Sequence, residues 1–96
     1  VKEFYPEVEI TKVQDGDIAI FNRETGVSFE FTGLNDGEII YVDNEDEYIE
    51  SDIPGIYRYD NFNDEYLYLA KGVNNLIITG GCRVQLKYKM FYYPQW

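Results

Sequence analysis

The sequence contains no histidine and a single cysteine among its 96 residues. Histidine is the most common acid–base catalyst and a frequent zinc ligand, so its absence removes the usual basis for both roles. One cysteine excludes an internal disulfide, and a nucleophilic cysteine would have no histidine base. We therefore expect no enzyme, no metal site and no cofactor, and we interpret Cys82 as a small buried apolar residue.

Basic residues and long apolar segments are also scarce. The chain has 8 lysines and arginines against 18 aspartates and glutamates, which gives a formal net charge of -10. Because an acidic surface repels phosphate groups, we expect no binding to nucleic acid or to an anionic membrane surface. No stretch approaches the roughly 18 apolar residues that a membrane-spanning helix needs, and the first residues do not resemble a signal peptide.

Aromatic and hydrophobic residues are abundant instead. They make up 18% and 45% of the chain, and aromatic and β-branched side chains favour strands. Turn signals recur about every ten residues, which is typical of sandwiches and barrels. We predict an all-β, two-layer antiparallel β-sandwich, jelly-roll-like, with a linker at 1–7 and one domain at 8–96. The expected strands cover residues 8–13, 17–22, 27–32, 38–43, 48–50 and 66–69, before a final hairpin.

That final hairpin is predicted in the segment 76–92, where two apolar runs flank Gly80 and Gly81. A two-glycine loop is a strong hairpin signal, because the tight turns of hairpins need positive φ angles. The second arm alternates between apolar and polar residues, which indicates an extended strand about twice the usual length. Its apolar face is predicted to carry Cys82, Val84, Leu86, Tyr88, Met90 and Tyr92.

A segment rich in aromatic, aspartate and asparagine residues offers a candidate contact surface. Flat rings beside carboxylates and amides can hold a sugar by stacking and hydrogen bonds, and tyrosine is also enriched in protein interfaces. The alternative is that these rings cover the open side of a small sandwich. The candidate glycan or partner contacts are Tyr57, Tyr59, Phe62, Tyr66 and Tyr68.

Two further stretches leave their roles open. Residues 43–47 form an acidic tip that lacks the glycine and the spacing of a calcium loop, so we expect a solvated, self-repelling hairpin tip. The aromatic end, residues 90–96, either forms an exposed apolar patch or folds back onto the sandwich.

A series of motifs spread over roughly residues 17–90 resembles one known family. In order come Asn22-Arg23-Glu24-Thr25-Gly26, Gly33-Leu34-Asn35-Asp36-Gly37-Glu38-Ile39-Ile40-Tyr41-Val42-Asp43, Phe62, Leu69, Gly72-Val73-Asn74-Asn75-Leu76-Ile77-Ile78 and Gln85-Leu86-Lys87-Tyr88. This order is similar to the C-terminal domain of the distal tail protein of long-tailed bacteriophages, the siphovirus tail-component family. The acidic insertion around 45–52 and the aromatic end depart from the family pattern.

The resemblance implies a galectin-like β-sandwich that is a structural component of a phage or prophage tail tip or baseplate. Such a component is made in the host cytoplasm, resides in the virion, and contacts other tail or baseplate proteins. The family forms its ring through an N-terminal domain that this chain lacks, so a ring is expected only when that domain is present. The alternative is a carbohydrate-binding module for host cell-wall polysaccharide, suggested by fold likeness. The matched positions have structural explanations, in turns and caps, at Thr25, Gly26, Gly37, Glu38, Asp43, Gly72, Asn74 and Tyr88.

Overall fold

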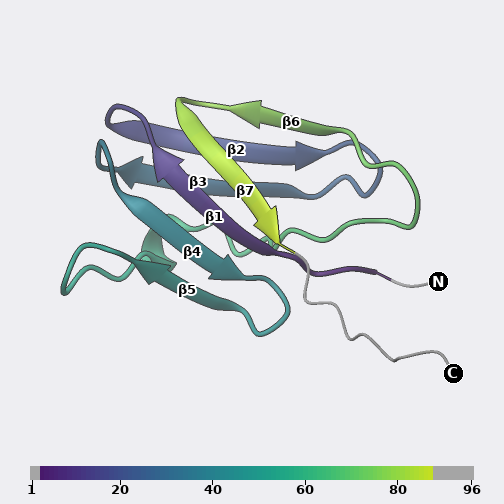
Figure 1. Cartoon of the computed structure of the whole chain (residues 1–96), viewed down its shortest axis with the longest axis horizontal. Helices are drawn as coiled ribbons and strands as arrows, with labels where there is room; N and C mark the ends of the chain where they lie inside the picture. The colour runs from purple at the N-terminus through teal and green to yellow at the C-terminus, as the bar shows by residue number, and fades with distance from the viewer. Residues whose placement is uncertain (1–2, 88–96) are drawn as a thin grey trace, which may run out of the picture.

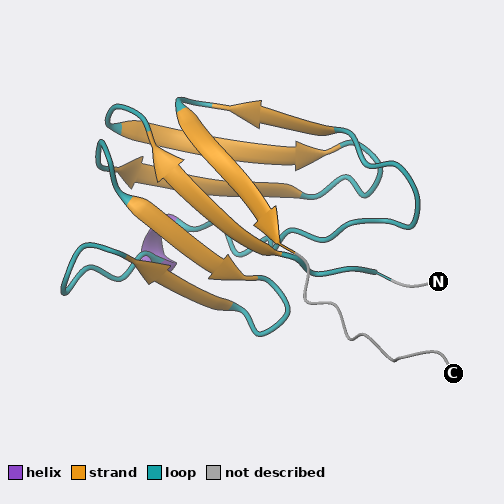
Figure 2. Ribbon diagram, in the orientation of Figure 1, coloured by secondary structure: helices purple, strands orange, loops and turns teal. Residues whose placement is uncertain are grey.

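Two antiparallel sheets pack on each other in the computed structural model, which describes residues 3–87 (Figures 1 and 2). The elements are β1 (Glu7–Lys12), β2 (Gly16–Asn22), β3 (Ser28–Leu34), β4 (Ile39–Asp43), β5 (Tyr48–Ser51), the 3-10 helix η1 (Tyr59–Asn61), β6 (Leu76–Thr79) and β7 (Cys82–Lys87). One sheet has the order β5-β4-β1-β7 and the other the order β3-β2-β6. The prediction of an all-β, two-layer antiparallel fold is confirmed.

The core lies between the two sheets and follows from the period of two along each strand. In β1, the buried positions alternate with half-buried ones, and the same pattern recurs in the first four residues of β3. Each such apolar side chain contributes roughly 1.5–3 kcal/mol when it leaves water. The buried apolar side chains of β1 to β4 include Val8, Ile10, Ile18, Ile20, Phe29, Phe31, Ile40 and Val42.

Most of the expected strands occur, each within two residues of its predicted bounds. These are the strands expected at 8–13, 17–22, 27–32, 38–43 and 48–50, which correspond to β1 to β5. The segment 66–69 was expected to be a strand, and this prediction is wrong. Only Leu69 pairs there, with Phe4, through reciprocal hydrogen bonds of 3.0 and 2.8 Å. The amide of Leu67 instead donates to the side chain of Asn44, so a side chain replaces the ladder.

The predicted hairpin at Gly80 and Gly81 is also wrong, because its two arms belong to different sheets. β6 pairs with β2, whereas β7 pairs with β1, so the glycines form a corner that crosses the sandwich (Figure 1). A Cβ atom on Gly80 would lie 2.2 Å from the carbonyl oxygen of Asp17, and one on Gly81 would lie 2.6 Å from that of Val13. Close backbone approach therefore requires both glycines.

The alternation predicted for the last strand is confirmed as far as the structure describes it. In β7, half-buried Cys82, Val84 and Leu86 alternate with exposed residues. The expected continuation to residue 92 and the aromatic end lie outside the described residues. In the segment expected as a linker, the backbone of Phe4 pairs with that of Leu69, and β1 begins at Glu7.

Candidate functional site

Glu38 lies at the centre of a buried polar network at the start of β4. Both of its oxygens accept hydrogen bonds from Arg58, at 2.8 Å from Nε and 2.7 Å from Nη2. The hydroxyl of Ser51 and the amide of Asn35 donate two more, at 2.6 and 3.0 Å. Burial by itself raises the pKa of Glu38, but these hydrogen bonds outweigh it and lower the pKa to about 2. The carboxylate is therefore charged at neutral pH and holds loops together.

A second network fixes the loop at 70–75 to the end of β2. The side chain of Asn74 accepts from the amide of Ala70 at 2.8 Å and donates to the carbonyls of Ala70 and Gly72 at 2.8 and 3.2 Å. Buried Asn22 donates to Asn74 at 3.1 Å and to the carbonyl of Tyr68 at 3.0 Å. Gly72 adopts a φ of +95°, which an L side chain rarely allows.

The other described residues of the family pattern occupy turns. Thr25 accepts from the amide of Val27 through its hydroxyl at 3.3 Å, in the turn that Gly26 also forms. Gly37 donates its amide to the carbonyl of Lys12 at 2.9 Å. Tyr88 lies outside the described residues. The described residues of the family pattern therefore shape separate loops, and they do not line a common cleft.

The acidic tip is a turn between β4 and β5, but it is not fully solvated as expected. Asp43 and Asn44 are buried, and only Glu45 to Glu47 are exposed. The carboxylate of Asp43 accepts from the amides of Glu45 and Asp46, both at 3.1 Å. Asn44 donates to the carbonyl of Pro6 at 2.7 Å, so its amide is needed for packing. Within residues 3–87 no group of three or more acidic or cysteine side chains is placed to hold a metal ion.

The five aromatic candidates do not form a single surface. Phe62 belongs to the core, with its ring centroid 5.2 Å from that of Phe29, and Tyr66 packs on it at 4.7 Å. Tyr68 packs on Tyr5 at 5.6 Å. In contrast, Tyr57 is 80% exposed and Tyr59 is 41% exposed. The structure therefore divides the segment into rings that cover the core and rings that face solvent.

Two tyrosines form hydrogen bonds to the backbone of β5 and of the turn that precedes it. The hydroxyl of Tyr59 accepts from the amide of Ile49 at 2.9 Å, and that of Tyr66 donates to the carbonyl of Glu47 at 3.3 Å. Burial and the nearby carboxylate of Glu47 raise the pKa of Tyr66. Tyr48, 47% exposed, begins β5 beside this turn. We group the exposed side chains of this turn, of the first residue of β5 and of the connection after β5 under one name, the hairpin patch: Glu45, Asp46, Glu47, Tyr48, Tyr57 and Tyr59.

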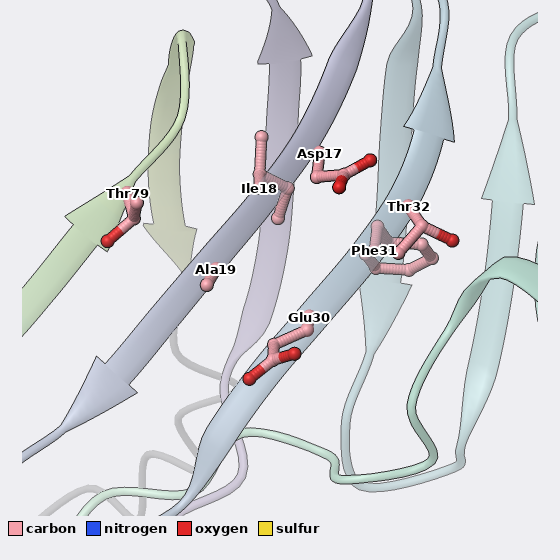
Figure 3. A pocket seen from close by; sticks show the side chains of 7 residues that line it. All are labelled: Asp17, Ile18, Ala19, Glu30, Phe31, Thr32 and Thr79. Carbon is pink, nitrogen blue, oxygen red and sulfur yellow. The ribbon is translucent and has the colours of Figure 1, made fainter.

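A shallow depression lies on the outer face of the three-stranded sheet (Figure 3). It arises because the small Ala19 sits in register with Glu30 on one side and Thr79 on the other. Its volume is about 140 Å³, less than half of the roughly 300 Å³ at which small-molecule pockets begin. The lining residues are Asp17, Ile18, Ala19, Glu30, Phe31, Thr32 and Thr79.

Sequence reasoning missed the structural roles of two basic side chains, Lys12 and Arg58. Lys12 is only 3% exposed, and its ammonium group donates to the carbonyls of Gly81 and Val13 at 2.8 and 3.0 Å. It occupies the third inward position of β1, which the alternation of that strand already marked. Arg58 is the one basic residue in 36–65, beside eleven acidic residues. This is the signal from which an ion pair of Arg58 with a carboxylate could have been predicted.

Together, the fold and these networks define a β-sandwich domain whose buried polar side chains stabilise its own turns and loops. Residues 1–88 match the family described as phage tail C-terminal domain, and the chain belongs to this family. The resemblance found in the sequence is confirmed at this level. Within residues 3–87, no helix has the length and apolar character to cross a membrane.

One relative is the SPbeta prophage-derived uncharacterized protein YomH of Bacillus subtilis (strain 168). It is 38% identical to this chain over 86 residues, a match that covers 88% of the chain and 34% of that protein. The chain therefore spans about a third of the length of this relative. No solved structure matches the chain significantly.

Proposed function

We propose that this chain is the C-terminal domain of a distal tail protein and acts at the phage tail tip by protein–protein contact. Its membership of the phage tail C-terminal domain family carries this proposal. The absence of histidine from the chain and the internal use of Glu38 and Arg58 argue against a catalytic role. Its partners are other tail or baseplate proteins, and its place is the tip of the tail in the virion.

The hairpin patch is the contact surface that the structure favours within residues 3–87. Tyr48, Tyr57 and Tyr59 expose 47%, 80% and 41% of their surface, and the turn that precedes Tyr48 carries three exposed carboxylates. Tyrosine is enriched in interface cores because it buries a large apolar area with little loss of side-chain freedom. The turn beneath it is held by Asn44 and Asp43, so the patch is presented on a fixed base.

Glycan binding is the second candidate, and the feature that favours it is the exposed ring of Tyr57, in a segment rich in aspartate and asparagine. A sugar ring needs an aromatic platform and several polar groups in one concave site. The depression near Ala19 holds carboxylates and hydroxyls but is small, and none of the exposed tyrosines of the hairpin patch lines it. Protein contact requires no such concave site.

The proposal is tested with the complete parent protein and with virions. Negative-stain images of the parent protein should show rings, and gold-labelled antibodies against this domain should bind at the tail tip. Only monomers in the images, or label along the whole tail tube, would contradict the proposal. A cell-wall glycan array with a clear binder, whose signal disappears with Tyr57→Ala, would favour the second candidate instead.

The contact role of the hairpin patch is tested by a double substitution, Tyr48→Ala with Tyr57→Ala, in the parent phage. Tails should assemble with less of the adjoining tip protein, while the isolated domain keeps its melting temperature. Val73→Ala is the matched control, because Val73 is 79% exposed in the loop at 70–75, away from the patch. Equal losses for both changes would contradict this role.

A further inference from the structure

The four edge strands of the sandwich differ in how their backbones are covered. Along β3, the carbonyl of Glu30 accepts from the amide of Asn63 at 3.1 Å, and the amide of Ser28 donates to the carboxylate of Glu65 at 3.2 Å. At β5, the hydroxyl of Tyr59 accepts from the amide of Ile49. The long connection between β5 and β6 thus covers both strands. Covered edges of this kind prevent pairing with other chains.

The edges of β6 and β7 have no such cover within the described part of the chain. The amide of Val13 donates to Gly81, and an antiparallel ladder alternates from there, so residues 83, 85 and 87 bond to β1. The amides and carbonyls of Cys82, Val84 and Leu86 therefore face outward. Both open strands lie on the same side of the sandwich, joined by the glycine corner (Figure 1).

The apolar side chains of these two strands are also incompletely covered. Ile77 and Ile78 of β6 are 47% and 46% exposed, although Ile78 lies opposite buried Ile20. In β7, Val84 and Leu86 pack against the core but remain half-buried. The open side therefore offers unpaired backbone groups together with apolar surface. A strand added to the sheet would form hydrogen bonds with the backbone groups and cover the apolar surface.

The charge of β7 is opposite to that of the chain as a whole. Arg83 and Lys87 are exposed on its outer face, in a chain of net charge -10. Lys87 lies opposite Glu7 in register, but the carboxylate of Glu7 accepts from the hydroxyl of Tyr41 at 2.9 Å. Among residues 3–87, neither Arg83 nor Lys87 forms an ion pair within 4.0 Å. Opposite charges on neighbouring strands stabilise a sheet.

We propose that β7 is the docking edge for an extended acidic strand of another tail protein, which extends the sheet β5-β4-β1-β7 by one strand. The strand carries carboxylates that face Arg83 and Lys87 and, at alternate positions, apolar side chains that cover Val84 and Leu86. This proposal rests on the proposed function and names the partner's chemistry. Pairing of two β7 strands from two copies would instead place four basic side chains together, which disfavours that arrangement.

The test uses assembled tails in which Gln85 of β7 is replaced by the photo-crosslinking amino acid p-benzoylphenylalanine. Irradiation and mass spectrometry should identify a peptide of another tail protein with acidic residues at alternate positions. A crosslink to a second copy of this chain, to a peptide without that pattern, or to nothing would overturn the proposal. The control replaces Glu50, on the covered strand β5, and should give a much lower yield.

The charge requirement is tested by Arg83→Glu with Lys87→Glu in the same crosslinking experiment. Reversal of both charges should lower the crosslink yield roughly tenfold, whereas Lys71→Glu, an exposed change in the loop at 70–75, should leave it unchanged. Equal yields for both variants would overturn the proposal. If the chain is absent from purified tails, the proposed function itself fails; if it is present without the crosslink, only this inference fails.

Discussion

The guanidinium group of Arg58 and the carboxylate of Glu38 form a two-point contact, at 2.8 and 2.7 Å, inside the domain. The side chains are 11% and 0% exposed. Arg58 lies in the connection between β5 and β6, whereas Glu38 lies just before β4. The pair therefore fastens the connection that covers two sheet edges to the four-stranded sheet, and it joins segments twenty residues apart.

Substitution of Arg58 by methionine should strongly destabilise the domain. The change leaves the carboxylate of Glu38 buried without its cation, and loss of one partner of a buried pair costs about 3–5 kcal/mol. Urea unfolding followed by circular dichroism measures the free energy of unfolding. Arg23→Met, an exposed change, is the matched control and should stay within about 0.5 kcal/mol. A similarly small effect of Arg58→Met would show that the pair is not buried.

The contribution of Glu38 should depend on pH in a definite direction. Its pKa is lowered from 4.5 to about 2 in the folded domain, so the folded state binds fewer protons than the unfolded state between these values. The stabilisation is present above about pH 4.5 and is lost as the pH falls toward 2. It amounts to something on the order of 3 kcal/mol. Urea unfolding at pH 7, 4 and 3 should show the deficit of Glu38→Gln shrinking at low pH; a constant deficit would contradict this.

Gly80→Ala should destabilise the domain far more than Gly55→Ala. Both glycines have positive φ angles, +96° and +78°, so both substitutions carry a similar conformational penalty of about 1–2 kcal/mol. Of these two glycines, only Gly80 would bring an added Cβ against a backbone oxygen, 2.2 Å from that of Asp17, whereas a Cβ on Gly55 would meet no described atom within 4 Å. Thermal unfolding of both variants measures the difference. Equal melting temperatures would rule out the crossing corner.

Phe62→Ala and Tyr57→Ala should separate the core rings from the surface rings. Phe62 is 6% exposed, and its loss should lower the free energy of unfolding by about 3–5 kcal/mol. Tyr57 is 80% exposed, and its loss should change stability by less than about 0.5 kcal/mol. Chemical denaturation of the two variants distinguishes them. A large destabilisation by Tyr57→Ala would argue that its ring packs on the domain.

The sequence was sufficient to predict the elements that depend on local alternation. The inward and outward faces of β1 and of Cys82–Lys87 follow from the period of two. Several turns could be placed at glycines, because tight turns need the positive φ angles that glycine allows. The strand expected at 66–69 shows the limit of this reasoning. Its alternation is real, since Leu67 and Leu69 are buried, but no neighbouring strand lies beside most of its backbone.

The local sequence pattern did not show which strands pair with each other when they lie far apart in the chain. The runs beside Gly80 and Gly81 are good strands, but nothing within them tells that one pairs with β2 and the other with β1. Likewise, the spacing of Tyr57 and Phe62 does not tell that one ring faces solvent and the other enters the core. Both outcomes depend on tertiary packing, which overrides local preference.

The place of β1 between β4 and β7 has a consequence for how the domain is made. Glu7 and Lys87 lie side by side in the finished sheet, so a nascent chain that has emerged only as far as β6 still leaves one flank of its first strand bare. Pairings of such long sequence separation form slowly. The four-stranded sheet is therefore completed only after β7 has emerged from the ribosome.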